Sequence, residues 1–180
     1  DLDGDGVADE RRDLADGFGP PAGIYGFNDH IVTGTRLGLD GLVYVSVGDK
    51  GVPLATGADG SQITLEGGGV IRMRPDGTEQ QQITFTDDWQ EGAPFYLPDN
   101  ETILYRAWKR SEYGKIKPTP MTVFTIKHDG TGHTVRTFDQ AMNWAPYPAP
   151  DGRHYVFVRV VEDNNWEVFL GDLAGGEPKR

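Results

Sequence analysis

Four aspartates near the start of the sequence have the spacing of a cation-binding loop. Asp1, Asp3, Asp5 and Asp9 stand in the run DLDGDGVAD, with a glycine at position 6 where such loops turn sharply. An EF-hand loop carries a bidentate glutamate at its twelfth position, but this chain has Arg12 there. We therefore predict a weak Ca²⁺ site, and the alternative is an acidic, solvated turn.

A histidine beside a carboxylate is the second feature that could carry chemistry. His30 follows Asp29 and comes just before a predicted strand. A neutral imidazole with a carboxylate neighbour can accept a proton from an alcohol near pH 7. The alternative is a loop histidine that hydrogen-bonds the backbone. His128, His133 and His154 fall on turns or strand starts without metal-ligand spacing, so we predict structural roles for them.

Two other stretches that could suggest catalytic or phosphate-binding motifs lack the neighbouring residues or secondary structure that those motifs need. Ser46 lies in an alternating Val-Ser-Val segment, and the sequence has no Gly-x-Ser-x-Gly elbow for a serine hydrolase. The glycine run at 67–69 precedes a predicted strand instead of a helix, which argues against a phosphate-binding loop. A sharp loop or a close approach of two backbones is the better explanation.

Internal repeats indicate the elements that position these residues. The segment Val70–Phe85 matches Val123–Phe138 at an offset of 53, and both have the pattern strand, Asp-Gly-Thr turn, strand. The segment Ala93–Asp99 matches Ala145–Asp151 at an offset of 52, and an alternating strand follows each copy. Glycine and proline are abundant, at 25 and 12 residues, which favours many short elements joined by tight turns.

A period of about 50 residues with these turns is typical of β-propeller blades. We predict an all-β fold with blades at about 31–86, 92–138 and 144–180. The third blade lacks an outer strand, whereas Arg11–Phe18 is an outer strand without a blade and could complete the third by strand addition. Because propellers have about four to eight blades, three would be a fragment or part of a larger or oligomeric propeller. The alternative is a β-sandwich with common Asp-Gly hairpins.

Charge and composition limit the partners. The chain has 17 basic and 28 acidic residues, a net charge of −11, which disfavours nucleic acid because phosphate contact needs a basic patch. No apolar run reaches the roughly 20 residues that a membrane span needs. Cysteine is absent, which excludes disulfides and thiolate sites. We expect self-association or membership of a larger complex, because an incomplete ring leaves apolar sheet faces open.

Residues 1–79 resemble the soluble pyrroloquinoline quinone (PQQ)-dependent glucose/sorbosone dehydrogenase family and its membrane-bound relatives. The resemblance rests on DLDGDGVADERRDLADGF, NDHIVTGTRLGLDGLVYVSVGDKG and GGGVIRMRPDGTE. It implies a six-bladed propeller in which Ca²⁺ polarises the quinone and His30, beside Asp29, is the general base. The residues that hold quinone and metal in that family belong to later blades, and none of them has a match in this sequence.

Residues 80–180 instead resemble TolB and TolB-like periplasmic propellers. The matching stretches are QITFTDDWQEGAPFYLPDNETILYRAW, VFTIKHDGTG and MNWAPYPAPDGRHYVFVRV. This resemblance implies repeats that bind proteins in the cell envelope without catalytic residues. The chain therefore looks composite, with a change of character near the turn at 76–78. We predict an acidic loop and orphan strand at 1–18, a dehydrogenase-like blade at 19–86 and TolB-like blades at 87–180, the last one incomplete.

Two functions of different class follow. The first is a non-catalytic, periplasmic or otherwise extracytoplasmic propeller module that binds or scaffolds a partner protein. The second is a PQQ-dependent sugar or alcohol dehydrogenase, or a piece of one, with His30 as the base and Ca²⁺ as the Lewis acid.

Overall fold

In the computed structural model, the residues described are 15–16, 32–48, 50–85, 88–162 and 165–180. Within these ranges the chain is built from antiparallel β-sheets, and its one helical element is the short 3-10 turn η2 (Arg110–Glu112). None of the helical structure described here is long and apolar enough to span a membrane. The all-β prediction is confirmed.

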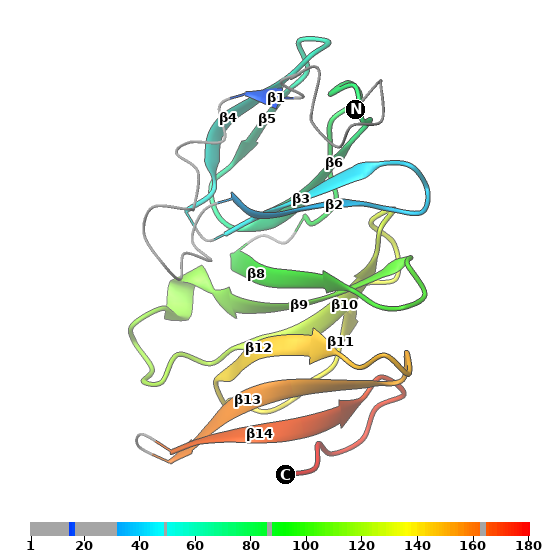
Figure 1. The fold of residues 1–180 in the computed structure, drawn as a ribbon. Coiled ribbons are helices and arrows are strands. Elements are labelled where there is room, and N and C mark those ends of the chain that lie inside the picture. The colour runs from blue at the N-terminus through cyan, green and yellow to red at the C-terminus, as the bar shows by residue number, and fades with distance from the viewer. Residues whose placement is uncertain (1–14, 17–31, 49, 86–87, 163–164) are drawn as a thin grey trace, which may run out of the picture.

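Three sheets follow one another along the chain and stack face to face as propeller blades (Figure 1). The first blade has the strand order β2 (Val32–Leu37), β3 (Val43–Val47), β6 (Gly69–Met73) and β7 (Gln81–Gln82). The second has β8 (Trp89–Tyr96), β9 (Thr102–Lys109), β10 (Thr122–Lys127) and β11 (Thr134–Val135). The third has β12 (Asn143–Pro148), β13 (His154–Glu162) and β14 (Asn165–Asp172).

A fourth, smaller sheet is inserted between β3 and β6. It consists of β4 (Val52–Gly57) paired with β5 (Gln62–Leu65), and β1 (Ala15–Asp16) pairs with β4 on its other side. In Figure 1 this β4–β5 hairpin lies beyond the first blade, at the end of the stack opposite the C-terminus. It takes the place that a preceding blade would have.

Apolar side chains fill each space between sheets, because strand alternation gives every blade two faces. We call the face toward the preceding sheet the front face and the face toward the following sheet the back face. The hairpin and the front face of the first blade share Val43, Val45, Val47, Val52, Ala55, Leu65, Ile71 and Met73. The back face of the first blade and the front face of the second share Tyr44, Val70, Ile83, Ile103, Tyr105, Ala107, Phe124 and Ile126. The next space holds Leu97, Leu104, Val123, Tyr155, Phe157 and Phe169.

The repeated turns have the same hydrogen bonds in each copy. In both Asp-Gly-Thr turns the aspartate carboxylate accepts from the threonine N–H two residues on, at 3.0 Å from Thr78 to Asp76 and 2.9 Å from Thr131 to Asp129. The Pro-Asp turns at Asp99 and 151 likewise use the carboxylate to accept the amides two and three residues on. Because each of these bonds joins residues two or three positions apart, every copy of the turn needs the same residue types, and the repeat can be recognised in the sequence.

Each of the inner strands β8 and β12 contains a β-bulge at an Ala-Pro-aromatic segment. The register shifts between Gly92 and Phe95 and again between Trp144 and Tyr147. Within the bulges, Ala93 has φ 51° and the alanine at position 145 has φ 48°, in the left-handed region that a side chain disfavours. The bulges bend the inner strands at equivalent positions of two blades.

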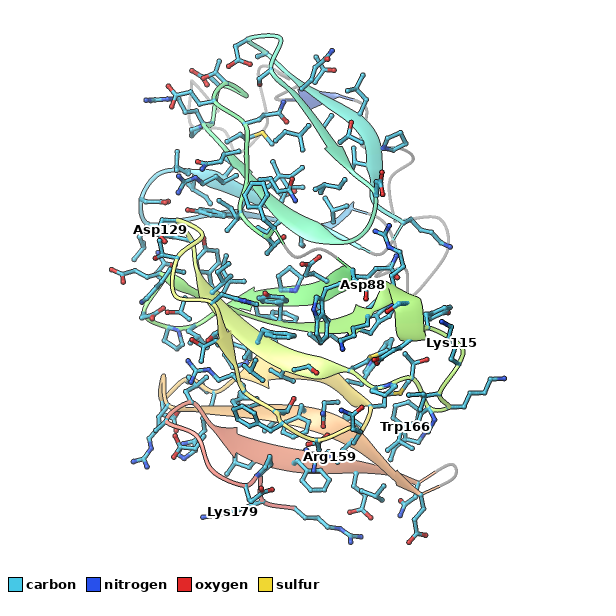
Figure 2. All side chains as sticks on the ribbon, turned by 180° about the vertical axis from the view of Figure 1, so that it is seen from behind. Asp88, Lys115, Asp129, Arg159, Trp166 and Lys179 are labelled. Carbon is cyan, nitrogen blue, oxygen red and sulfur yellow. The ribbon has the colours of Figure 1, made fainter. Side chains whose placement is uncertain are left out.

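The structure corrects the predicted place of the orphan strand. Of the predicted strand at 11–18, the described residues Ala15 and Asp16 pair with Gly57 and Thr56 in β4, not with the third blade. The edge of the third blade is instead taken by Lys179, which exchanges two backbone hydrogen bonds with Leu170 at 2.7 and 2.9 Å. Figure 2 shows Lys179 beside this outer edge. A nearby segment forms the contact because its short turn costs less entropy than a connection across the molecule.

Candidate functional site

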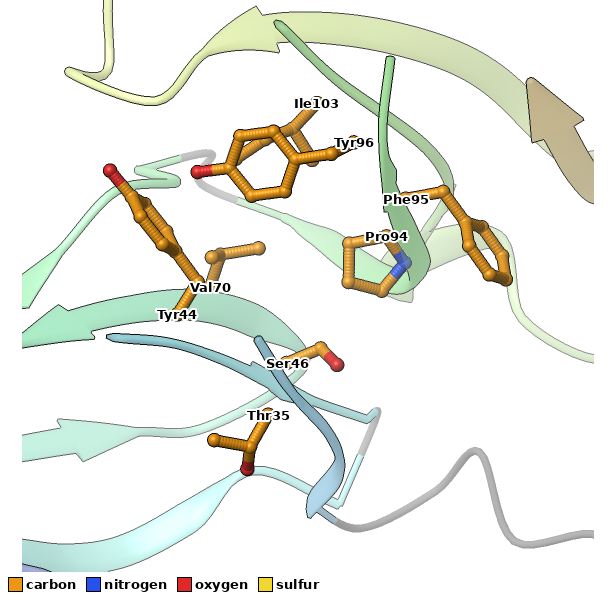
Figure 3. A pocket seen from close by; sticks show the side chains of 8 residues that line it. All are labelled: Thr35, Tyr44, Ser46, Val70, Pro94, Phe95, Tyr96 and Ile103. Atoms are coloured by element: carbon orange, nitrogen blue, oxygen red, sulfur yellow. The ribbon is translucent and has the colours of Figure 1, made fainter. Parts of the chain in front are cut away.

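A cavity of about 210 Å³ lies between the first and second blades, beside their inner strands (Figure 3). Its walls are mostly apolar and aromatic, and they come from Thr35, Tyr44, Ser46, Val70, Pro94, Phe95, Tyr96 and Ile103. The rings of Tyr44 and Tyr96 meet edge to face, with centroids 5.1 Å apart. Cofactor and ligand pockets are commonly about 300–1,000 Å³. The cavity therefore suits one side chain or a small ring.

A polar cluster adjoins this cavity through Tyr44, which lines the cavity wall. The Tyr44 hydroxyl donates to the Asp40 carboxylate at 2.6 Å, and the Leu42 amide donates to the same group at 3.0 Å. The His128 Nδ1 lies 3.4 Å from that carboxylate, and Arg72 donates to the His128 carbonyl at 3.2 Å. These contacts join the first blade to the turn that follows β10 in the second blade.

The ionisation of this cluster suits binding better than proton transfer. Burial acts to raise the pKa of Asp40, but hydrogen bonds from Tyr44 and Leu42 outweigh it and hold that pKa below its ordinary value. Burial and the bond to Asp40 raise the pKa of Tyr44. A carboxylate that stays ionised and a phenol that stays protonated are poor acid–base partners near pH 7.

A second cavity, of about 120 Å³, contains a buried carboxyl group. Glu91 is 5% exposed, and burial raises its pKa to about 8 in spite of the nearby Arg110. The backbone of Gly68 packs so closely that a Cβ there would lie 1.7 Å from the Glu91 carbonyl oxygen. The predicted close backbone approach of the 67–69 glycine run is thus confirmed.

The back face of the third blade is apolar and exposed. Val156 pairs with Leu170 and Val158 with Val168, so the four side chains lie on one face. Their exposed fractions are 39% for Val156, 40% for Leu170 and 63% for Val168. Contiguous apolar surface of this kind marks interaction sites on soluble proteins.

The residues predicted as sites from sequence lie outside the described part of the chain. This holds for the aspartates of the predicted Ca²⁺ loop, Asp1, Asp3, Asp5 and Asp9, and for the predicted base His30 with its neighbour Asp29. The Ca²⁺ site and the catalytic base therefore stay predictions. Over the described ranges, no three His, Cys, Asp or Glu side chains are grouped as a metal site.

Sequence reasoning missed the inter-blade cavity, and it expected open sheet faces at the ends of the stack without naming their residues. Alternation in Leu42–Val47 places Tyr44 and Ser46 on one face, and this signal could have found the first wall. The second wall comes from residues some 50 positions further on, and their approach depends on how the blades stack. For the open face, the signal was the valine-rich alternation of Tyr155–Val161.

Comparison with solved structures identifies the fold. A protein of Agrobacterium tumefaciens assigned as TolB is 18% identical, with a TM-score of 0.50, over 82% of this chain and 65% of that one. A chain of the nidogen/laminin complex is 15% identical, with a TM-score of 0.51, over 84% of this chain and 48% of that one. Likeness at this level shows the fold, a β-propeller. The chain spans less than two thirds of either structure.

Comparison with families and curated proteins gives one match. None of the curated proteins matches the sequence. A family model covers residues 1–107, which include the first blade, the hairpin, β8 and most of β9, and which run across the turn at 76–78. The matched segment is more than half of the chain. By that match, the chain belongs to the family described as Domain of unknown function (DUF7133).

Proposed function

We propose that this chain is a non-catalytic β-propeller module that binds a partner protein. The observation that carries the proposal is the exposed back face of the third blade, where Val156, Val168 and Leu170 are each more than a third exposed. Burial of such a face on a partner would release about 25 cal/mol per Å² of apolar surface. Isolated exposed apolar residues are ordinary, but here three are neighbours on two paired strands.

Two further features support a binding role. The Asp40–Tyr44 pair has pKa shifts that oppose proton transfer near neutral pH. The TolB-like blades also favour an extracytoplasmic module of the cell envelope, as the sequence resemblance of residues 80–180 implies. We propose that location together with the binding function.

The test compares two aspartate variants at exposed apolar positions. Val168→Asp places a charge on the back face of the third blade, and Leu54→Asp, in β4, places one on the far end of the stack. Each tagged chain captures proteins from a cell-envelope extract, and a captured protein is then purified and its binding is measured by calorimetry. We expect Val168→Asp to weaken binding at least tenfold and Leu54→Asp to leave it unchanged. A captured protein that binds all three chains equally would refute the proposal.

The dehydrogenase function depends on His30 and Asp29 and stays a separate prediction. Added PQQ and Ca²⁺ with glucose or an alcohol and a dye acceptor would give turnover that His30→Ala abolishes. Turnover that survives this substitution would exclude His30 as the base.

A further inference from the structure

A buried polar side chain stands at the same place of the repeat in both interfaces between blades. The offset of 52 between the second and third blades puts Glu91 at the place of Asn143, and Ala107 at the place of Arg159. Glu91 pairs with Ala107 across its sheet, just as Asn143 pairs with Arg159. Glu91 is 5% exposed and Asn143 is 0% exposed. The two interfaces can therefore be compared position by position.

The interface between the second and third blades holds a guanidinium group at this place. Nε of Arg159 donates to the side-chain oxygen of Asn143 at 2.8 Å, and its Nη2 donates to the Asp139 carboxylate. The side-chain amide of Asn143 in turn donates to the Met121 carbonyl oxygen at 2.9 Å. Only 15% of the Arg159 side chain is exposed. This part of the blade frame thus suits a guanidinium group when oxygen acceptors face it.

The interface between the first and second blades has the same frame but lacks the arginine. The Val70 N–H donates to the Thr84 hydroxyl at 3.2 Å, and the equivalent bond at the next interface is 2.9 Å long. In place of Arg159 stands Ala107, which is 1% exposed and has no chain beyond its methyl group. The cavity of about 120 Å³ lies beside Glu91 at this interface. Because a water molecule takes about 30 Å³, a guanidinium group fits such a space.

The charges around this cavity favour a single cation. Its charged side chains are Glu66, Glu91 and Arg110, and its polar ones are Thr64, Gln82 and Thr84. Arg110 lies 3.3 Å from Glu66, and their side chains are 45% and 83% exposed, which places the cavity at the surface. When Glu91 is ionised, the described residues that line the cavity sum to one negative charge. A monovalent cation brings that sum to zero.

We propose that this cavity binds a guanidinium group supplied by another molecule, with the Glu91 carboxylate as its anionic partner. The bound group takes the place that Arg159 takes at the next interface. The side chains of Gln82 and Thr84 line the same cavity and carry oxygen acceptors for further N–H groups. The inference goes beyond the proposed function, because the site is separate from the back face of the third blade.

Binding at this site is coupled to the loss of a proton. Burial raises the pKa of Glu91 to about 8, so the ligand-free carboxyl is protonated near pH 7. The other charged or titratable groups that face it are Glu66, Arg110 and Tyr105 of β9. Burial, and to a smaller extent the charge of Glu91, raises the pKa of Tyr105, so this phenol stays protonated. Below the pKa of Glu91, its ionised fraction rises about tenfold per pH unit, and the apparent Kd for a guanidinium group falls by the same factor.

Methylguanidinium is the probe, and its binding is followed by NMR at constant ionic strength. The indole N–H of Trp89, which lines the cavity, reports the binding. We expect the Kd to fall about tenfold from pH 6 to pH 7 and to level off above pH 8. Methylammonium should bind about fivefold more weakly or worse, because it lacks the planar fork of donors, and tetramethylammonium, which has no N–H, should not bind. N-acetyl-arginine amide and free L-arginine, titrated in the same way, distinguish an arginine side chain from the free amino acid as the source.

Four variants locate the site. Glu91→Gln should abolish binding, whereas Glu112→Gln, on the 3-10 turn outside the cavity, should leave the Kd unchanged. Arg110→Gln should tighten binding about threefold or more, because it removes a positive charge from the cavity wall. Ala107→Arg supplies the guanidinium group from within the chain, as in the third blade, and should block the probe. If Ala107→Arg does not fold, Glu91→Gln decides the question.

Equal binding by Glu91→Gln and the unaltered chain would overturn the inference, and so would a Kd that stays constant from pH 6 to pH 8. Equal affinity for all three cations would overturn it as well, because the attraction would then be that of the acidic surface as a whole. These measurements do not involve the back face of the third blade. Their failure would leave the proposed function unaffected.

Discussion

Replacing Glu91 by glutamine should make the protein more stable at alkaline pH and have little effect near pH 4.5. The carboxyl group is 5% exposed, and burial raises its pKa from 4.5 to about 8. In the unfolded chain the group ionises above pH 4.5, whereas in the folded chain it keeps its proton until about pH 8. Stability is therefore lost as pH rises between these values, by up to about 1.4 kcal/mol per pH unit.

The pKa shift sets the size of the effect. A change from 4.5 to about 8 corresponds to an upper limit of about 5 kcal/mol at pH 8, and we expect about 3–5 kcal/mol. Glutamine has nearly the same volume and cannot ionise, so the variant does not lose this free energy. The difference in unfolding free energy between Glu91→Gln and the unaltered chain should be near zero at pH 4.5 and should rise steadily to pH 8.

Urea unfolding, measured at half-unit steps from pH 4.5 to 8.5, gives this difference. Glu66→Gln is the control, because the Glu66 side chain is 83% exposed and pairs with the same Arg110. Its effect should stay within about 0.5 kcal/mol at every pH. A flat difference for Glu91→Gln would show that the carboxyl is hydrated in the folded protein, and the argument from burial would fail.

Three further predictions concern single sites. Gly68→Ala should lower the free energy of unfolding in urea by more than about 3 kcal/mol, because its Cβ would lie 1.7 Å from a backbone oxygen. The control Gly41→Ala, at φ 79° with open space around it, should cost about 1 kcal/mol. Equal costs for the two variants would contradict the close contact at Gly68. Tyr44→Phe should cost about 1–2 kcal/mol and raise the pKa of Asp40, as followed by NMR titration, and an unmoved pKa would refute the bond. Ca²⁺ at about 5 mM should raise the melting temperature, with a Kd for Ca²⁺ of about 10⁻⁴–10⁻³ M, and the rise should be smaller in Asp3→Asn. An unchanged melting temperature would mean that the acidic loop is a solvated turn.

The sequence was sufficient where the deciding interactions are local. The Asp-Gly-Thr turns at 76–78 and 129–131 are closed by bonds that span two residues, so the same letters give the same turn at both places. Strand alternation likewise indicated which side chains share a face. These two signals were enough to predict propeller blades.

The β4–β5 hairpin was not predicted, because the interactions that stabilise it are distant in the sequence. The segment Val52–Gly57 contains a proline and alternates poorly, and a strand of its own would be a weak prediction. Its pairing is fixed by burial of Val52 and Ala55 on the first blade. The burial of Glu91 could not be predicted from sequence either, because the residues that pack on it belong to the glycine loop between β5 and β6, far from Glu91 in the sequence.

The two ends of the stack differ in a way that limits assembly. At one end the hairpin covers the first blade and presents Gln62 and Thr64 to solvent together with the partly exposed Leu54. At the other end Val156, Val168 and Leu170 are open. Two complementary open ends would make a head-to-tail contact that does not close, and such contacts propagate into fibres. Because the hairpin covers the front face of the first blade, the described residues leave one open apolar sheet face, and front-to-back stacking of chain on chain would not propagate.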